Sequence, residues 1–105
     1  MNFAIDKKEL NMSGLEITRR AGYAFFRDPK SGQESFVRRL HGEFYPRFHL
    51  YLSEERGHLV FNLHLDQKKA SYEGTHKHSA DYDGPVVAEE LERLKQVILK
   101  LLHRQ

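Results

Sequence analysis

Histidines supply the residue types and spacing from which this sequence could build a metal site. Two of them, His49 and His64, lie in alternating segments on either side of a short turn, and two more form a His-x-His pair in GTHKHSADYD. Zinc usually takes three or four nitrogen, sulfur or oxygen ligands, so two imidazoles need further partners. The candidate metal ligands are His49, His64, His76 and His78, with Asp66 or Asp81 as the carboxylate. Cross-strand histidines also stack, bond to neighbours or face water, and the sequence favours this plainer interpretation.

The elements that must position these side chains form a β-hairpin whose register follows from burial. The runs RFHLYLSEE and HLVFNLHLD alternate apolar and polar residues, which is typical of strands that bury one face. With Leu52 opposite Phe61, all apolar partners share one face, whereas a one-residue slip would bury an asparagine and a histidine. Each costs about 1–3 kcal/mol when unpaired. The favoured register pairs Arg47 with Asp66, His49 with His64 and Tyr51 with Asn62.

The polar face of this hairpin is the first candidate for a ligand site. The net charge is only +2, yet residues 19–47 contain seven Lys and Arg residues against three Asp and Glu. An excess of positive charge favours anionic partners, so we expect a small binding domain for an anionic ligand, with nucleic acid as one candidate. The predicted ligand-binding residues are Arg47, His49, Tyr51, Asn62, His64, Asp66, Lys68 and Tyr72.

A second hypothesis is a metal-dependent or histidine-based hydrolytic enzyme. His64 and Asp66 could work with Lys68 and Tyr72 as a general acid/base group, since histidine titrates near neutral pH and a carboxylate can orient it. Neither serine between residues 67 and 82 has the context of a nucleophile elbow, so we assign no catalytic residue. A third hypothesis is a homodimeric interaction protein without chemistry.

The remaining segments predict an α+β fold, with an antiparallel sheet of about four strands covered on one face by a C-terminal helix. LEITRRAGYAFF, at 15–26, reads as a strand, and an Asp-Pro turn leads to residues 32–40, which fit a strand better than a helix started by the Ser31–Glu34 capping box. Residues 67–82 form a long polar connection, and residues 1–12 are expected to be extended or partly ordered.

The C-terminal helix starts near Pro85, after a cap at Asp83 or Gly84. Its apolar residues recur at spacings of four and three, so one face must be buried, and they are Val87, Leu91, Leu94, Ile98 and Leu101. The same spacing fits a coiled-coil seam and hence a homodimer through this helix. Packing on the chain's own sheet explains it more simply.

Composition limits the function further. The chain of 105 residues is one domain by length, and it has no cysteine, which excludes disulfides, cysteine zinc sites and thiol nucleophiles. No segment reaches the roughly 20 apolar residues of a membrane span, and the first residues lack a signal-peptide core. We therefore expect a cytoplasmic protein with no membrane partner.

Several short runs also resemble a known group of sequences. YPRFHLYL, HLDQKK, SYEG, HKH and DYDG, followed by an acidic helix start, are similar to a family of small uncharacterised bacterial proteins. The resemblance spans about residues 17–92. It implies no activity, so it assigns no role to any residue.

Overall fold

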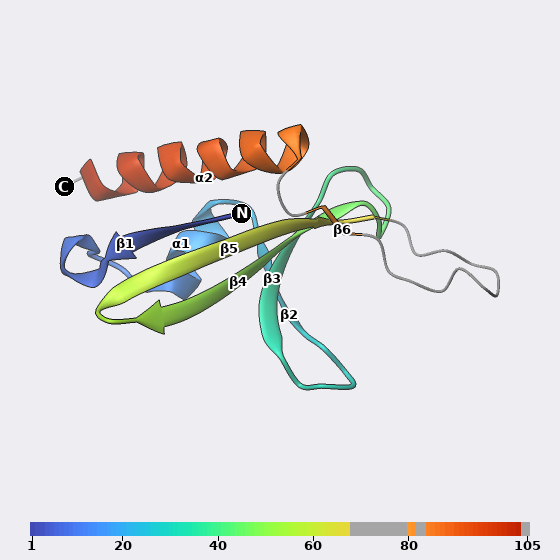
Figure 1. Ribbon diagram of the computed structural model, residues 1–105, viewed down its shortest axis with the longest axis horizontal. Helices are drawn as coiled ribbons and strands as arrows, with labels where there is room; N and C mark the ends of the chain where they lie inside the picture. Colours follow the sequence, from blue (N-terminus) through green and yellow to red (C-terminus); the bar gives the residue numbers. More distant parts are fainter. Residues whose placement is uncertain (68–79, 82–83, 104–105) are drawn as a thin grey trace.

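The computed structural model describes residues 1–67, 80–81 and 84–103, and it has an α+β fold (Figure 1). The strands are β1 (Asn2–Asp6), β2 (Ala24–Arg27), β3 (Glu34–Arg39), β4 (Arg47–Glu55), β5 (His58–Asp66) and β6 (Ala80–Asp81). The helices are α1 (Gly14–Arg20) and α2 (Pro85–His103), with a single 3-10 turn at Lys7–Glu9. No helix in these ranges is long and apolar enough to cross a membrane.

The strands form one antiparallel sheet in the order β1-β5-β4-β3-β2, and the short β6 pairs with the end of β5. The C-terminal helix α2 runs along one face of the sheet, which confirms the predicted fold class (Figure 1). Five main strands are present instead of about four, because the N-terminal segment adds one strand.

Part of the segment over residues 1–12, expected to be extended or partly ordered, is an extended strand that is built into the sheet. Residues 2–6 pair with β5, and Phe3 lies opposite Phe61 with the two rings stacked at 4.8 Å. The N-terminal amino group donates to the carbonyl oxygen of Leu63 at 3.1 Å. Phe3 and Ile5 supply the alternation that one buried face requires, although the run is too short to stand out in the sequence.

The predicted single strand over residues 15–26 is wrong in its first half. Residues 14–20 form α1, and only residues 24–27 form a strand. Ser13 caps this helix, since its hydroxyl accepts from the backbone N–H of Glu16 at 3.1 Å in an S-x-x-E capping sequence. The helix ends before Gly22, whose φ of +95° suits glycine. Local capping therefore outweighed the β-branched and aromatic composition.

The two hairpins agree with the sequence. Residues 34–39 form a strand paired with β2, so the helical alternative for this segment is wrong. The β4–β5 register is the predicted one at all four paired positions named above. Its turn contains Arg56 and Gly57, both with positive φ, as a two-residue hairpin loop that follows the right-handed strand twist requires.

The core lies between the sheet and the two helices. All five predicted apolar residues of α2 are buried, and all except Leu101 belong to one cluster with β4 and β5 side chains such as Leu50, Phe61 and Leu63. Ile17 of α1 joins the same cluster. The apolar stripe of α2 is thus used within the chain, and the homodimer through this helix stays a prediction.

Candidate functional site

The opposite face of the sheet carries a compact polar cluster centred on Asp66. His49 Nδ1 lies 2.8 Å from Asp66 Oδ2, and His64 Nε2 lies 3.0 Å from the other oxygen, Oδ1. The Nε of Arg47 donates to Oδ2 at 3.3 Å. All four residues are buried, with Asp66 only 4% exposed. One carboxylate therefore joins three cationic or titratable side chains from two strands.

The register explains why these side chains meet. Arg47 lies opposite Asp66 and His49 opposite His64, so the four form two adjacent rows across β4 and β5. Residues two apart on a strand point to the same face, which brings His64 and Asp66 together along β5. The cluster is a direct product of the apolar alternation, because burying one face fixes what the other face presents.

Ser35 on β3 is a member of the cluster that the sequence reasoning missed. Its hydroxyl lies 2.7 Å from His49 Nε2, so both ring nitrogens of His49 have partners. Ser35 is only 2% exposed and lies inside the sheet, where its hydroxyl supports the imidazole. The alternation in ESFVRRL indicates that Ser35 lies on the opposite face of the strand from Phe36. The pairing of β3 with β4 was needed to identify His49 as its partner.

Aromatic rings restrict the imidazoles further. The Tyr51 ring stacks against His49 at 4.6 Å and against His64 at 5.5 Å between centroids, and Phe26 contacts His49 edge-on at 6.2 Å. The centroids of His49 and His64 are 5.2 Å apart. These contacts exclude water from the rings and hold their planes, which strengthens the hydrogen bonds between them and Asp66.

Arg47 is held inside the structure, in contrast to the exposed anion contact that the sequence suggested. Its guanidinium lies 4.3 Å from the centre of the Phe44 ring and 5.0 Å from those of Tyr45 and Phe26. With only 5% of its surface exposed, Arg47 depends on Asp66 for its negative partner. The ion pair and the cation–π contacts together fix this arginine in place.

The electrostatics of the cluster keep Asp66 ionised. Burial raises the pKa of this carboxyl, but hydrogen bonds from His49 and His64 outweigh burial and hold the pKa well below its usual range. Asp66 therefore offers a carboxylate at any ordinary pH, and carboxylate oxygen is a ligand for zinc and other divalent ions.

Three of these residues could hold a metal ion. One ligand atom from each of His49, His64 and Asp66 can be chosen so that all lie within 4.8 Å of one another. Two imidazoles and one carboxylate are a recurrent donor set for catalytic zinc and for non-haem iron. Ser35 would then hold the outer nitrogen of His49, the role that hydrogen-bond partners of metal-bound histidines usually have.

The predicted site residues have three different outcomes. Arg47, His49, Tyr51, His64 and Asp66 are brought together, whereas Asn62 is exposed further along the same face, opposite Tyr51. Lys68, Tyr72, His76 and His78 lie outside the described residues, as does the side chain of Asp81. The structure therefore bears on only half of the predicted four-histidine set.

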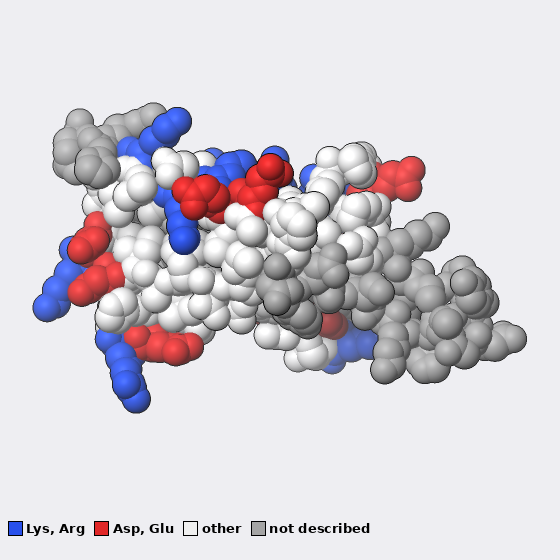
Figure 2. Space-filling model, turned by 45° about the horizontal axis from the view of Figure 1, so that its top comes forward, with Lys and Arg blue, Asp and Glu red and all other residues white. Residues whose placement is uncertain are grey.

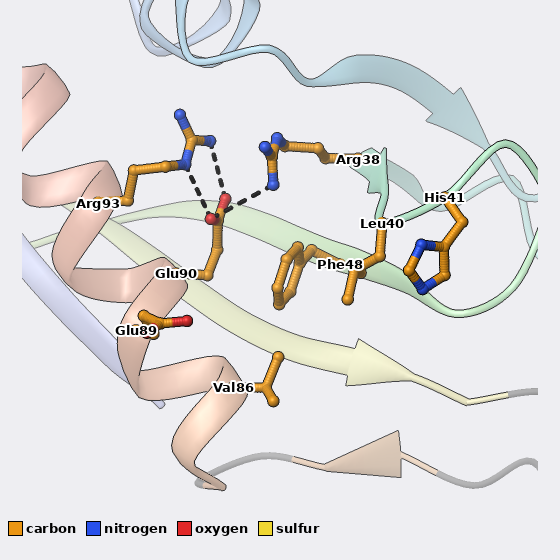
Figure 3. A pocket seen from close by; sticks show the side chains of 8 residues that line it. All are labelled: Arg38, Leu40, His41, Phe48, Val86, Glu89, Glu90 and Arg93. Atoms are coloured by element: carbon orange, nitrogen blue, oxygen red, sulfur yellow. Dashed lines mark hydrogen bonds and ion pairs between the residues drawn. The ribbon is translucent and has the colours of Figure 1, made fainter.

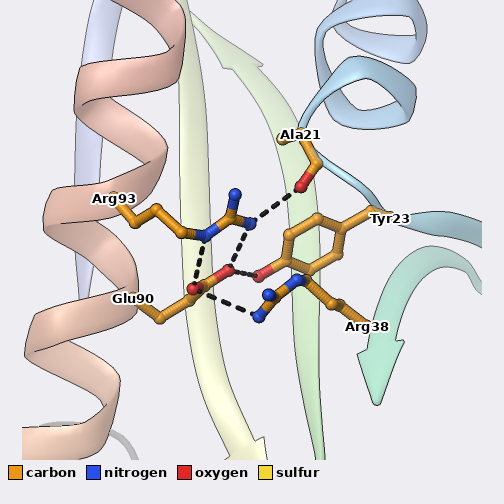
Figure 4. A network of polar contacts seen from close by, with 5 residues as sticks. All are labelled: Ala21, Tyr23, Arg38, Glu90 and Arg93. Carbon is orange, nitrogen blue, oxygen red and sulfur yellow. Dashed lines mark hydrogen bonds and ion pairs between the residues drawn. The ribbon is translucent and has the colours of Figure 1, made fainter. Parts of the chain in front are cut away.

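A second buried polar network lies on the helix side of the sheet (Figure 4). The carboxylate of Glu90 accepts from the Tyr23 hydroxyl at 2.7 Å and from Arg93 through two contacts of 2.8 Å, with Arg38 at 3.5 Å. Arg93 also donates to the carbonyl oxygen of Ala21 at 2.8 Å. These bonds tie α2 to β3 and to the segment after α1, which gives the network a structural role.

An open pocket of about 490 Å³ lies beside this network (Figure 3). Arg38, Glu90 and Arg93 form one end, and Phe48, Leu40 and Val86 form an apolar wall. The buried charge of Glu90 is already matched by the arginines and Tyr23, so the pocket offers a ligand no unpaired buried group.

Comparison of the chain with protein-family models, with curated proteins and with solved structures found no match.

Proposed function

We propose that this protein binds a divalent metal ion, with zinc as the best fit, through His49, His64 and Asp66. The observation that carries the proposal is that two imidazole nitrogens from neighbouring strands are aimed at one ionised carboxylate. A metal ion would replace these two hydrogen bonds with coordination bonds of about 2.0–2.2 Å. The side chains would need only small shifts, because their ligand atoms already lie close together.

Ser35 supports both states of His49. Without metal, the His49 tautomer that carries its proton on Nδ1 donates to Asp66 and accepts at Nε2 from the Ser35 hydroxyl. With metal on Nδ1, the ring proton resides on Nε2 and is donated to the oxygen of Ser35. A hydroxyl can donate or accept, so the 2.7 Å contact persists in either case. Three protein ligands leave a fourth position open, as in catalytic zinc sites, and this arrangement supports the hydrolytic hypothesis.

A second role, a purely structural one, is favoured by Arg47. Its guanidinium lies 3.3 Å from Asp66 and neutralises the carboxylate, which lowers the attraction for a cation. A closed network of Arg47, His49, His64 and Asp66 would then serve to fix the strand register, as buried polar groups do in some proteins. This role predicts that no metal binds.

Zinc titration of untagged protein separates the two roles. We expect one equivalent of zinc, and stabilisation by about 2.7 kcal/mol when free zinc is 100 times the dissociation constant. His49→Gln and His64→Gln should each lower zinc affinity at least 10-fold, while His58→Gln, at the exposed first residue of β5, should not. Zinc binding that is absent, or unchanged in both site variants, would refute the metal proposal.

A further inference from the structure

The strand β1 forms an edge of the sheet that no other described strand covers. It comes first in the order β1-β5-β4-β3-β2, so only one of its sides is paired. The backbones of Met1 and Lys7, at its two ends, both bond toward the β5 side. Because alternate residues of an antiparallel pair bond to the neighbouring strand, the N–H groups of Asn2, Ala4 and Asp6 point outward. This row of unpaired donors is a template for another strand.

The sequence of β1 does not protect this edge. Natural edge strands are commonly blocked by proline, by lysine or by a bulge that twists the strand away. The strand NFAID contains neither proline nor lysine, and its register against β5 is continuous from residue 2 to residue 6. Ala4, at its centre, is small and exposed, so a second strand can approach closely.

An apolar groove of about 510 Å³ lies along the α2 side of this edge. Its apolar lining comes from β1 and from the C-terminal half of α2, and it consists of Phe3, Ile5, Ile98, Leu99 and Leu102. Leu99 is 47% exposed. The side of the molecule that carries α2 has a broad uncharged area bordered by charged side chains (Figure 2). An open strand edge beside an apolar groove fits a partner that adds a strand and places apolar side chains in the groove.

Opposite charges lie at the two ends of the groove. Lys95 is next to Phe3, with its Nζ 5.6 Å from the centre of the ring, whereas Asp6 and Glu9 lie at the other end of β1. Neither Lys95 nor Glu9 forms an ion pair with another described residue. A groove with a cation at one end and carboxylates at the other is complementary to a second copy of itself after a half-turn.

A two-fold axis at Ala4 satisfies the strand, the groove and the charges together. Ala4 would lie opposite Ala4 of the second copy as a hydrogen-bonded pair, because its backbone groups point outward. On the groove side, Phe3 would lie opposite Ile5 of the second copy, so apolar side chains would meet. The same half-turn brings Lys95 of each copy to the carboxylate end of the other.

We propose that a second copy of this chain docks at this edge, with β1 pairing antiparallel to its counterpart around Ala4. The two sheets then form one continuous sheet, with both α2 helices on the same face and Leu99 of each copy in the shared groove. Because the same patch serves both copies, the interface closes as a dimer and does not extend into a fibre. This interface differs from a coiled-coil seam, whose residues on α2 are buried in the core of the chain, and it does not involve the metal cluster on the other face.

Sedimentation of untagged, full-length protein from low to high micromolar concentrations tests the dimer, with a chelator present so that metal cannot link two copies. We expect a monomer–dimer equilibrium that Ala4→Pro weakens by about 10-fold or more, because proline removes the donors that meet at the axis. The N–H of Ala4 does not bond to β5, so circular dichroism should show the same fold in this variant. A monomer at every concentration overturns the proposal and leaves the edge to a strand of a different protein. A dimer that Ala4→Pro leaves unchanged also overturns it.

Leu99→Lys tests the groove without altering β1. This variant should weaken the dimer by about 10-fold or more, because it places a charge in the shared apolar groove. Val86→Lys is the matched control, since Val86 is a 44% exposed apolar residue of α2 outside the groove, and it should leave the dimer unchanged. Equal weakening by both variants would show a loss that is not specific to the groove and would overturn the proposal.

Charge reversal tests the orientation of the two copies. Lys95→Glu should weaken the dimer at low ionic strength, because it brings like charges together across the axis. Adding Glu9→Lys should restore the dimer, because opposite charges then meet again. A double variant that dimerises no better than Lys95→Glu alone contradicts the antiparallel pairing around Ala4.

Discussion

Replacement of Asp66 by Asn tests the central claim that one carboxylate holds the polar cluster together. Asn keeps the size of the side chain but removes the charge that pairs with Arg47 at 3.3 Å and with two imidazoles at 2.8 and 3.0 Å. Removing one partner of a buried ion pair costs about 3–5 kcal/mol, because the other charge is left buried and unpaired. Since domains of this size are stable by only about 5–15 kcal/mol, much of the stability should be lost.

Urea unfolding followed by circular dichroism at pH 7 measures this cost. Glu54→Gln is the control, since it removes an exposed ion pair with Lys7, which is worth no more than about 1 kcal/mol. Adding Arg47→Met to Asp66→Asn should recover part of the loss, because the unpaired cation is removed. A cost for Asp66→Asn below about 1 kcal/mol, equal to that of the control, would refute the reasoning.

The pH dependence provides an independent check on the same residue. The pKa of Asp66 is lower in the folded protein than its value of about 3.9 in an unfolded chain. Unfolding then takes up a proton as the pH falls, so the contribution of Asp66 is present above about pH 4 and is lost progressively below it. Asp66→Asn should lack this part of the acid-induced loss. An identical acid profile in the variant and the parent protein would contradict the assignment.

Two further predictions concern the other side of the sheet. Tyr23→Phe should lower the free energy of unfolding, measured in urea, by about 1.5–3 kcal/mol, because it removes a hydrogen bond to the charged Glu90. Burial and the Glu90 carboxylate raise the pKa of Tyr23, so ultraviolet absorbance should show that Tyr23 is still protonated in the folded protein above pH 10. The free energy of unfolding should then fall as the pH rises further. Leu63→Ala should cost about 2–5 kcal/mol in the same assay because Leu63 is fully buried, whereas Val86→Ala, at an exposed position on α2, should change stability by less than about 0.5 kcal/mol.

The sequence predicted the structure best where burial requires apolar residues to recur at a regular spacing. The β4–β5 register and the buried face of α2 both follow from apolar spacing, since a shifted alternative would bury polar groups. Capping was also readable at α1, where Ser13 and Glu16 form the S-x-x-E sequence, but the composition of residues 15–26 pointed to a strand. Competing local signals therefore limited the prediction there.

The tertiary structure alone decided which side chains pack around the cluster from outside the hairpin. The sequence placed Arg47, His49, His64 and Asp66 on one face, because apolar alternation leaves the polar positions together. The sequence could not place Ser35 against His49 or Phe44 against Arg47, because those contacts require β3 and its loops to pack beside β4. Which strands become neighbours depends on how the whole core packs, whereas the face on which a residue lies depends on the alternation along its own strand. The polar face of the hairpin was thus a property of the sequence, and its closure into a buried cluster was a property of the fold.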